Sequence, residues 1–577
     1  MKTNPIKRIF AALAAGAVFA AAFTSCEKWL EEESFDFTQP DDIEDSDAGA
    51  TQWLIGTYSK LGDNLFNSNT FPMVWIYDED YLTGPDWAFG NIGAGNFQNN
   101  GYINGMWEGL YNLIHRCNYA AYEVGRMQHV DDRLRTAIYG EMKFLKAWSY
   151  FQLVRAFGPV PLRKESISET GDRNVPRSSV GEVYAYIIEL LEDAQTECYK
   201  NTDKDFVQGR VSAGTAAGLL AKVYATIASG AMPEGTRIWV RGGKPWSGEG
   251  TDKAYTDPQK IEYRKQRLAG YEEFDPQTYW ELAYKKAGQV MSGEYGAYEL
   301  VPYDRLWKRS ERYNGEYMWN YDGFASDKRY CEYFSYHICG IENSSGLIAD
   351  GMWYGGRDHW YKMVESKDLR VAEGIRHRWQ RTWDLTFAQY YPNTQEWNRK
   401  VENKEPPFDD GLSYACPQFD TYYLAYPTKY ADRTDRTVQE GDSFWPLLRY
   451  ADVVLIYAEA YAEAVGTTDG KALAALNDVR NRSGATPREL GGQGGIGDLV
   501  DFRSSVLEER AIEFLCEGDR RWDLIRWGIY VDVMNAIGGN DEIGIYKGRQ
   551  QKHTLFPIPS SEMDANASIT ENNPGWN

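Results

Sequence analysis

The sequence predicts a mainly α-helical protein: a degenerate, tetratricopeptide-like scaffold of stacked helix pairs, interrupted by long, irregular, aromatic-rich loops. Two observations support this fold class. Apolar residues recur at intervals of three and four in several segments, as in the buried face of a helix. Between those segments lie long stretches rich in Gly, Pro, Tyr and Trp that show no helical period. Aromatic residues make up 15% of the chain, and many of them fall in these irregular stretches.

The helical period is clearest in three segments, 107–121, 138–148 and 213–227. Small residues alternate with large ones there, which lets helices approach each other closely in antiparallel pairs. We expect further helices over 280–291, 450–465 and 473–482. Such pairs bury a continuous core only by packing on their neighbours. A strict repeat of about 34 residues is not visible, so we predict a degenerate array.

The N-terminus has the layout of an export signal. Lys2, Lys7 and Arg8 precede an apolar run that ends in Phe-Thr-Ser-Cys. This ending resembles the lipobox of bacterial lipoproteins, which implies that residues 1–25 are a lipoprotein signal peptide and that Cys26 is acylated. Ordinary signal cleavage beside a free Cys is the alternative. The acidic residues that follow predict a solvated tether over 26–50.

Charge and motif content exclude several classes of function. The formal net charge of −22 repels phosphate backbones, so we expect no nucleic-acid partner. The six His form no HExxH motif, and we expect no metal site. The glycines of "GGQGGIG" (491–497) have dinucleotide-binding spacing but follow a loop instead of a strand, so we expect no cofactor.

Several blocks resemble one family in the order in which they occur. The first is "YGEMKFLKAWSYFQLVRAFGPVPL" (139–162), and the last is "LFPIPSSEMDANASITENNPGW" (555–576). Between them lie "VSAGTAAGLLAKVYA", "LRYADVVLIYAEAYAEA", "LNDVRNRSGA" and "VLEERAIEFLCEGDRRWDLIRWG". The chain resembles the SusD/RagB family of outer-membrane nutrient-binding lipoproteins over nearly its whole length after Cys26.

The resemblance implies a division of the chain into three regions. Residues 51–320 form an N-terminal helical repeat region with a ligand loop at 77–97 and an insertion at 229–276. Residues 321–446 form a variable ligand-binding lobe. Residues 447–577 form the C-terminal SusD/RagB helical region, whose dense charges we interpret as structural ion pairs.

Two Gly-rich, aromatic stretches are the candidate ligand site, because Trp and Tyr rings stack on the apolar faces of sugars while polar side chains bond to the hydroxyls. For each aromatic residue, packing in the core is the alternative. The candidate residues are Asp78, Asp80, Trp87, Phe89 and Asn96 in the first stretch, and Tyr336, Trp353, Tyr354, Arg357 and Trp360 in the second.

The resemblance implies a non-catalytic, cell-surface lipoprotein that captures an oligosaccharide. It would be anchored by lipid in the outer membrane, facing the cell exterior, and would pass its ligand to a SusC-like TonB-dependent barrel. Two alternatives stay open: a RagB-like lipoprotein that binds peptides, and a secreted glycosidase that uses Asp78 or Asp80.

Overall fold

The computed structural model describes residues 43–66, 70–248, 253–417, 423–468, 470–492 and 494–576. The predicted signal peptide and Cys26 lie outside these residues. The described chain is mainly helical, which confirms the predicted fold class. None of its helices is both long and apolar enough to cross a membrane.

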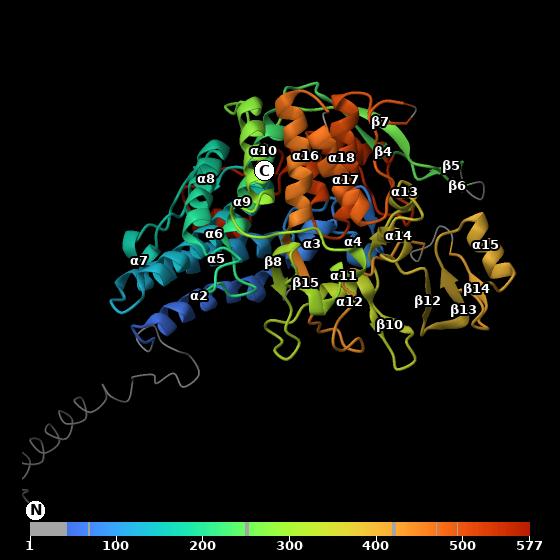
Figure 1. Ribbon diagram of the computed structural model, residues 1–577, viewed down its shortest axis with the longest axis horizontal. Coiled ribbons are helices and arrows are strands. Elements are labelled where there is room, and N and C mark those ends of the chain that lie inside the picture. Colours follow the sequence, from blue (N-terminus) through green and yellow to red (C-terminus); the bar gives the residue numbers. More distant parts are fainter. Residues whose placement is uncertain are drawn as a thin grey trace, which may run out of the picture.

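The long helices form one continuous stack (Figure 1). Each helix packs on the next long one along the chain, and α10 packs on α16 across the lobe insertion. This is the order of contacts that stacked helix pairs require. The helices of the stack are α2 (Asp47–Leu61), α5 (Gly101–Arg126), α6 (Asp132–Phe157), α8 (Val180–Glu197), α9 (Ala213–Ala231), α10 (Pro276–Met291), α16 (Tyr450–Val465) and α17 (Gly470–Arg482).

Local sequence sets where these helices begin. The Asn100 side chain accepts hydrogen bonds from the backbone N–H groups of the first turn of α5, and Asp131 does the same for α6. At the start of α8, Ser179 and Glu182 form a capping box, in which each side chain bonds to the other residue's backbone N–H.

The predicted tether ends earlier than expected. Helix α2 begins at Asp47, so the last residues of the range 26–50 belong to the folded scaffold. The Asp45 carboxylate accepts hydrogen bonds of 2.9 Å from the backbone N–H groups of Gln128 and His129. Asp47 accepts one of 2.8 Å from the N–H of Asp131. These acids hold α2 against the loop between α5 and α6 instead of extending into solvent.

Short elements fill the turns of the N-terminal region. They are η2 (Gly62–Phe66), α3 (Thr70–Ile76), β1 (Leu82–Thr83), α4 (Asp86–Phe89), β2 (Val160–Pro161), α7 (Ile167–Thr170), β3 (Arg177–Ser178), α11 (Tyr303–Leu306) and η4 (Arg309–Glu311). Strand β2 pairs with β3.

The insertion at 229–276 is a β-hairpin that lies on the C-terminal region. Strands β4 (Arg237–Gly242) and β7 (Gln259–Arg264) pair antiparallel along their full length, and β5 (Trp246–Ser247) pairs with β6 (Ala254–Tyr255). The backbone N–H of Trp239 donates to Ser504 in α18 (Leu499–Glu513) at 2.8 Å. The rest of that region is α19 (Arg520–Arg526), α20 (Tyr530–Ala536), η5 (Gln551–Thr554) and α21 (Ser560–Ala565).

Two paired strands mark the base of the predicted lobe. Strand β8 (Tyr317–Asp322) leads out of the scaffold, and β15 (Phe444–Arg449) returns antiparallel beside it, with Phe444 opposite Asp322. The lobe between them therefore leaves and re-enters the scaffold at one place, close to the predicted limits of 321 and 446.

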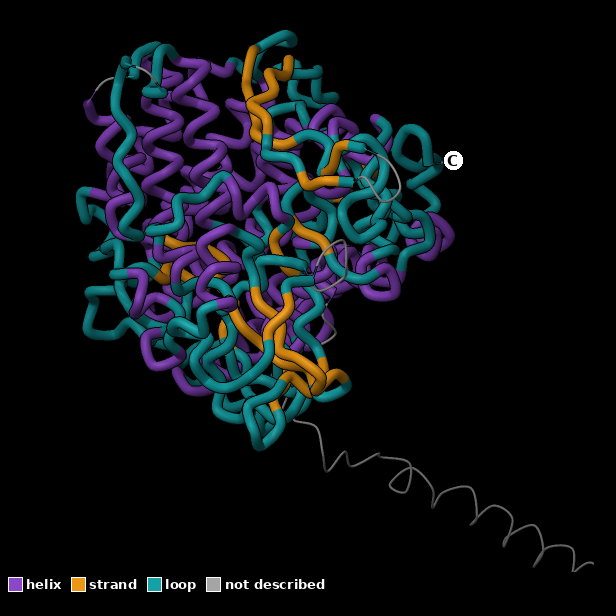
Figure 2. The backbone as a smooth tube through the Cα atoms, turned by 90° about the vertical axis from the view of Figure 1, so that its right-hand side faces the viewer, coloured by secondary structure: helices purple, strands orange, loops and turns teal. Residues whose placement is uncertain are grey.

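Within the lobe, a five-stranded sheet has the order β14-β13-β12-β10-β9. Figure 1 places β10, β12, β13 and β14 beside the block of long helices, and Figure 2 views the molecule from that side. The lobe contains α12 (Phe334–Cys339), β9 (Ile341–Glu342), β10 (Ile348–Asp350), β11 (Gly355–Gly356), α13 (Asp358–Lys362), α14 (Leu369–Ala372), β12 (Arg378–Arg381), β13 (Asp384–Tyr390), α15 (Gln395–Glu402) and β14 (Tyr414–Ala415).

Candidate functional site

The fold brings the two predicted ligand stretches together. Strand β1 of the first stretch pairs antiparallel with β11 of the second, with Leu82 opposite Gly356 and Thr83 opposite Gly355. Glycine is needed in β11 because a Cβ on Gly356 would lie 2.9 Å from the Trp360 ring. A Cβ on Gly355 would lie 2.8 Å from Leu424. The close approach of these backbones places the aromatic residues that follow β1 beside those that precede β11.

An exposed aromatic patch forms where the two stretches meet. Trp87 in α4 is 68% exposed, and its ring meets the half-buried Trp353 ring edge to face, with centroids 4.5 Å apart. Behind Trp353 lie the rings of Tyr336, at 5.0 Å, and His337, at 4.9 Å. Trp353 is therefore held by rings on more than one side, while Trp87 presents most of its surface to solvent.

Polar groups border these rings. The Tyr336 hydroxyl donates to Asp350 Oδ2 at 2.6 Å, and Asp350 Oδ1 accepts from the N–H of Gly351 at 2.7 Å. Burial lowers the pKa of His337 to about 4, so this ring is neutral at pH 7. The border of the patch thus includes a fixed, half-buried carboxylate and an uncharged imidazole.

A third tryptophan, Trp383, belongs to the same region. It is 53% exposed at the turn between β12 and β13. The Arg381 guanidinium lies 4.9 Å from the Trp383 ring centroid and donates to the carbonyls of Gly351 and Met352, directly before Trp353. We call Trp87, Trp353 and Trp383, with Tyr336 and Asp350, the aromatic patch.

Trp383 was not among the ligand residues predicted from the sequence. Its signal was the segment "RWQRTWDLTFAQYY" (378–391), which has the composition of a strand pair with a tryptophan at the turn. Among the tryptophans in the part of the chain that the structure describes, only Trp87 and Trp383 are exposed. Large exposed aromatic side chains are typical of binding surfaces.

The structure corrects the prediction for Asp78 and Asp80. Both are buried, and their carboxylates pair with arginines of the C-terminal region. Asp78 pairs with Arg521 and, at 2.7 Å, with Arg549, while Asp80 forms a two-pronged pair with Arg520 at 2.8 and 2.7 Å. These carboxylates hold the ligand loop to the scaffold and are not available to bond to a sugar.

Five more predicted ligand residues are buried, and of these Tyr336, 5% exposed, borders the patch through its bond to Asp350, while the other four lie in the interior. Phe89 stacks on Tyr77, and Tyr354 packs against both. Arg357 bonds to Glu542 at 2.6 Å, and the Trp360 indole donates to the Ala511 carbonyl at 3.0 Å.

Burial makes these four residues parts of the support behind the patch, because a ligand at the surface does not reach them. Asn96 is exposed, with its amide bonded to the Gly90 carbonyl at 3.2 Å, and its role stays a prediction.

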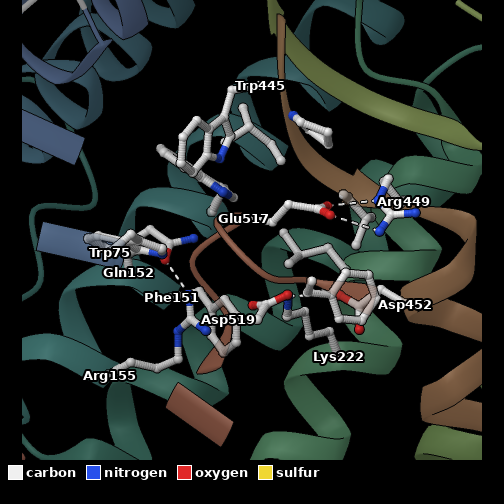
Figure 3. Close-up of a pocket in the computed structure, with 16 residues that line it drawn as sticks. Trp75, Phe151, Gln152, Arg155, Lys222, Trp445, Arg449, Asp452, Glu517 and Asp519 are labelled. Carbon is white, nitrogen blue, oxygen red and sulfur yellow. Dashed lines mark hydrogen bonds and ion pairs between the residues drawn. The ribbon is translucent and has the colours of Figure 1, made fainter. Parts of the chain in front are cut away.

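Charged residues of the C-terminal region pair within the interior, as the sequence predicted. Several of these charged residues line the hollow of Figure 3. The hollow has a volume of about 30 Å³, and in it Glu517 pairs with Arg449 at 2.8 Å, while Lys222 pairs with Asp452 at 2.8 Å and with Asp519 at 2.7 Å. A hollow of this size has room for water only. The charges there stabilise the join between the helix stack and the C-terminal region.

Comparison with known proteins shows the family. The sequence profile of the SusD family matches residues 238–576, and a second profile, described as starch-binding proteins associating with the outer membrane, matches residues 28–225. The chain belongs to the SusD family.

Other members of the SusD family match along nearly the whole chain. SusD-like protein P25 of Formosa agariphila is 24% identical, with 95% of each chain covered. A SusD homologue from Bacteroides thetaiotaomicron superposes with a TM-score of 0.71 at 21% identity, covering 93% of this chain and 98% of its own. A laminarin-binding SusD-like protein reaches 0.63 at 19% identity, covering 92% and 100%. These likenesses establish the fold.

No group of three or more His, Cys, Asp or Glu within the described ranges is placed to hold a metal ion. The six cysteines in those ranges are free. The side chains of the aromatic patch thus offer indole rings, one phenol hydroxyl and one carboxylate.

Proposed function

We propose that this SusD family member is a non-catalytic lipoprotein that binds an oligosaccharide at the aromatic patch. The observation that carries the proposal is that two exposed tryptophans lie at the half-buried Trp353 segment: Trp87 contacts the Trp353 ring, and Trp383 lies beside Arg381, which bonds to the backbone directly before Trp353. Sugar rings stack on such faces, and a carboxylate such as Asp350 accepts hydrogen bonds from hydroxyl groups.

Two alternatives are less well supported. The glycosidase hypothesis relied on Asp78 and Asp80, which are buried in ion pairs with arginines. A glycosidase needs two carboxyl groups that flank the bond it cleaves. In the peptide-binding hypothesis, the same aromatic patch binds a peptide instead of an oligosaccharide. A structurally similar laminarin-binding SusD-like protein and the surface glycan-binding protein A of Bacteroides fluxus favour a glycan.

The proposal extends to anchoring and delivery. Acylated Cys26 would hold the protein in the outer membrane, facing the cell exterior, where a SusC-like TonB-dependent barrel would take over the captured ligand. The lipobox and the outer-membrane association in the description of the matching profile support this part. A binding protein without a spanning helix among its described residues needs a partner to move ligand across a membrane.

Isothermal titration calorimetry against a glycan library and a peptide library tests the binding proposal. We expect a glycan to bind the wild-type protein and to bind the Trp87→Ala variant at least tenfold more weakly. If peptides bind and no glycan does, the ligand is a peptide and the glycan-binding proposal is wrong. Sustained release of reducing ends from a glycan would overturn the non-catalytic part.

Copurification tests the partner. Wild-type lipoprotein, extracted from outer membranes with detergent, should bring down a barrel, and Cys26→Ala should lose membrane attachment. If the wild-type protein brings down no barrel, delivery to such a partner is wrong while glycan binding stands.

A further inference from the structure

A large cavity, separate from the aromatic patch, is lined by none of the patch residues. It has a volume of about 660 Å³, within the range of about 300–1,000 Å³ that is usual for small-molecule sites. The end of α6, the start of α8, the loop at 267–272, α19 and the C-terminal tail enclose it. Its walls are mostly apolar, with Val154, Val180, Leu268, Ile525 and Leu555 among them.

One buried cation on the wall, Arg155, lacks a matching anion. Arg155 is 8% exposed and lines this cavity as well as the hollow of Figure 3. Its guanidinium donates to Gln152 Oε1 and lies between the rings of Phe151, at 4.1 Å, and Trp522, at 5.2 Å. Its Nε has no hydrogen-bond partner among the described residues. The carboxylates that attract it, Asp519 and Asp523, form their ion pairs with other cations: Asp519 with Lys222 at 2.7 Å, and Asp523 with Arg510 at 2.7 Å.

Several other buried arginines of this protein have a carboxylate partner, whereas Arg433 bonds to the Ser335 hydroxyl and to backbone carbonyls. Arg357, Arg370, Arg449 and Arg510 each form an ion pair with at least one buried carboxylate. Leaving a buried charge without a counter-ion is costly, and burial lowers the pKa of Arg155 for the same reason. An anion in the cavity would remove this cost.

The charge around the cavity also favours an anion. Arg267 and Lys552 line it in addition to Arg155, whereas Glu272 is the one carboxylate among its lining residues. Glu272 already pairs with Arg267 at 3.1 Å. This local excess of positive charge occurs on a chain whose net charge is −22.

We propose that this cavity binds an amphiphilic anion, with its apolar part against the walls and its carboxylate or sulfonate bonded to Arg155. Apolar walls suit a hydrocarbon chain or aromatic ring and offer few partners to the hydroxyls of a sugar. The site is distinct from the aromatic patch, because none of the patch residues lines it. Its test is therefore independent of glycan binding.

The probes are 8-anilino-1-naphthalenesulfonate, decanoate and decanol. The protein is the full chain with Cys26→Ala, which avoids detergent. We expect the naphthalenesulfonate to fluoresce on binding to the native protein. Decanoate should displace it at a concentration at least tenfold lower than decanol, because only decanoate pairs with Arg155.

Two variants locate the site. Arg155→Gln should weaken decanoate about tenfold and leave decanol unchanged. Ile525→Trp should place a ring in the cavity and reduce the fluorescence, while glycan binding persists. Trp87→Ala is the matched control, with the fluorescence retained and glycan affinity lost.

Three results would overturn the proposal: no fluorescence with the wild-type protein, full fluorescence with Ile525→Trp, or equal displacement by decanoate and decanol. If circular dichroism shows that Arg155→Gln does not fold, the comparison of decanoate with decanol on the wild-type protein and the Ile525→Trp variant still decides the question.

Discussion

Trp87 and Trp360 show how one residue type serves two purposes within the predicted site. Trp87 is exposed at the patch, whereas Trp360 is buried and bonds to the Ala511 carbonyl. We expect Trp87→Ala to weaken glycan binding by about 2 kcal/mol, roughly 30-fold, with an unchanged melting temperature. Calorimetry and thermal unfolding measure the two quantities. A large fall in melting temperature with unchanged affinity would make Trp87 a core residue.

Trp360→Ala is the matched comparison. Removing this buried ring should lower the free energy of unfolding by about 3–5 kcal/mol, because it leaves a cavity and an unpaired carbonyl. Urea denaturation measures the loss. Stability equal to that of the wild type would be inconsistent with the buried position.

Glu79 gives the protein a pH-dependent stability. Burial raises the pKa of Glu79 from 4.5 to about 8. Between these values the folded state keeps a proton that the unfolded chain releases. The free energy of unfolding contributed by this group is therefore full below pH 4.5 and falls as pH rises toward 8, by up to about 1.4 kcal/mol per pH unit.

Glu79→Gln should remove that slope, because an amide does not titrate. Urea denaturation at pH 5, 6, 7 and 8 compares the two proteins. Identical slopes would show that Glu79 is ionised in the folded state.

At the scale of elements, an ion pair and a hydrogen bond on its buried side hold the ligand loop to α19 and to the lobe. Asp80 pairs with Arg520 in α19, and the Asp80 carbonyl accepts a hydrogen bond of 2.5 Å from Arg357 in the lobe. We expect Asp80→Ala to lower the free energy of unfolding by about 3–5 kcal/mol, because it leaves Arg520 buried without its partner.

The exposed Asp86 on the same loop supplies the control, since Asp86→Ala should change stability by no more than about 0.5 kcal/mol. Denaturant unfolding and glycan titration are measured on both variants. A stable Asp80→Ala protein that no longer binds glycan would return Asp80 to the ligand site.

Elements specified by local patterns could be predicted from the sequence. Helices α5, α6 and α9 follow from the spacing of their apolar residues, which each segment carries by itself. The exposed aromatic stretches were also visible, although which of their rings face solvent was not. The sheet of the lobe was not predicted, because its strands are short and pair with distant segments.

The assignment of Asp78 and Asp80 failed for a similar reason. Their partners lie 440 and more residues away along the chain. The segment 77–97 is rich in Gly and polar residues, and such a composition predicts a surface loop. The acids of the predicted tether misled in the same way, since the partners of Asp45 lie more than 80 residues later.

At the scale of the whole molecule, buried ion pairs join the lobe to the C-terminal region and depend on ionised carboxylates. Burial alone would raise the pKa of Glu509, but Arg370 and Arg480 outweigh it and hold this pKa below 4.5. Burial likewise opposes ionisation of Glu513, and Arg482 and Arg449 hold its pKa well below 4.5. Groups of this kind stabilise the fold above pH 4.5, and their contribution is lost as pH falls through the folded-state pKa.

We therefore expect the free energy of unfolding to fall steeply below about pH 4. Unfolding by urea between pH 3 and 6 measures it. Arg480→Met should lower the free energy of unfolding at pH 6 and make its fall between pH 6 and 3 smaller, since Glu509 loses one of the cations that keep its folded-state pKa below 4.5. An unchanged acid transition in this variant would contradict the role given to the pair.

The paired strands β8 and β15 have a consequence for how such proteins can diversify. The lobe leaves and rejoins the scaffold at one place. Its hairpin of β12 and β13 and its helix α15 can therefore be replaced by other sequences without changing the path of the scaffold helices. Three buried cations of the lobe must be retained, because each pairs with a carboxylate of the C-terminal region. They are Arg357, Arg370 and Lys429. A new ligand preference can thus arise from changes on the exposed side of the lobe, while these three cations keep the lobe attached to the C-terminal region.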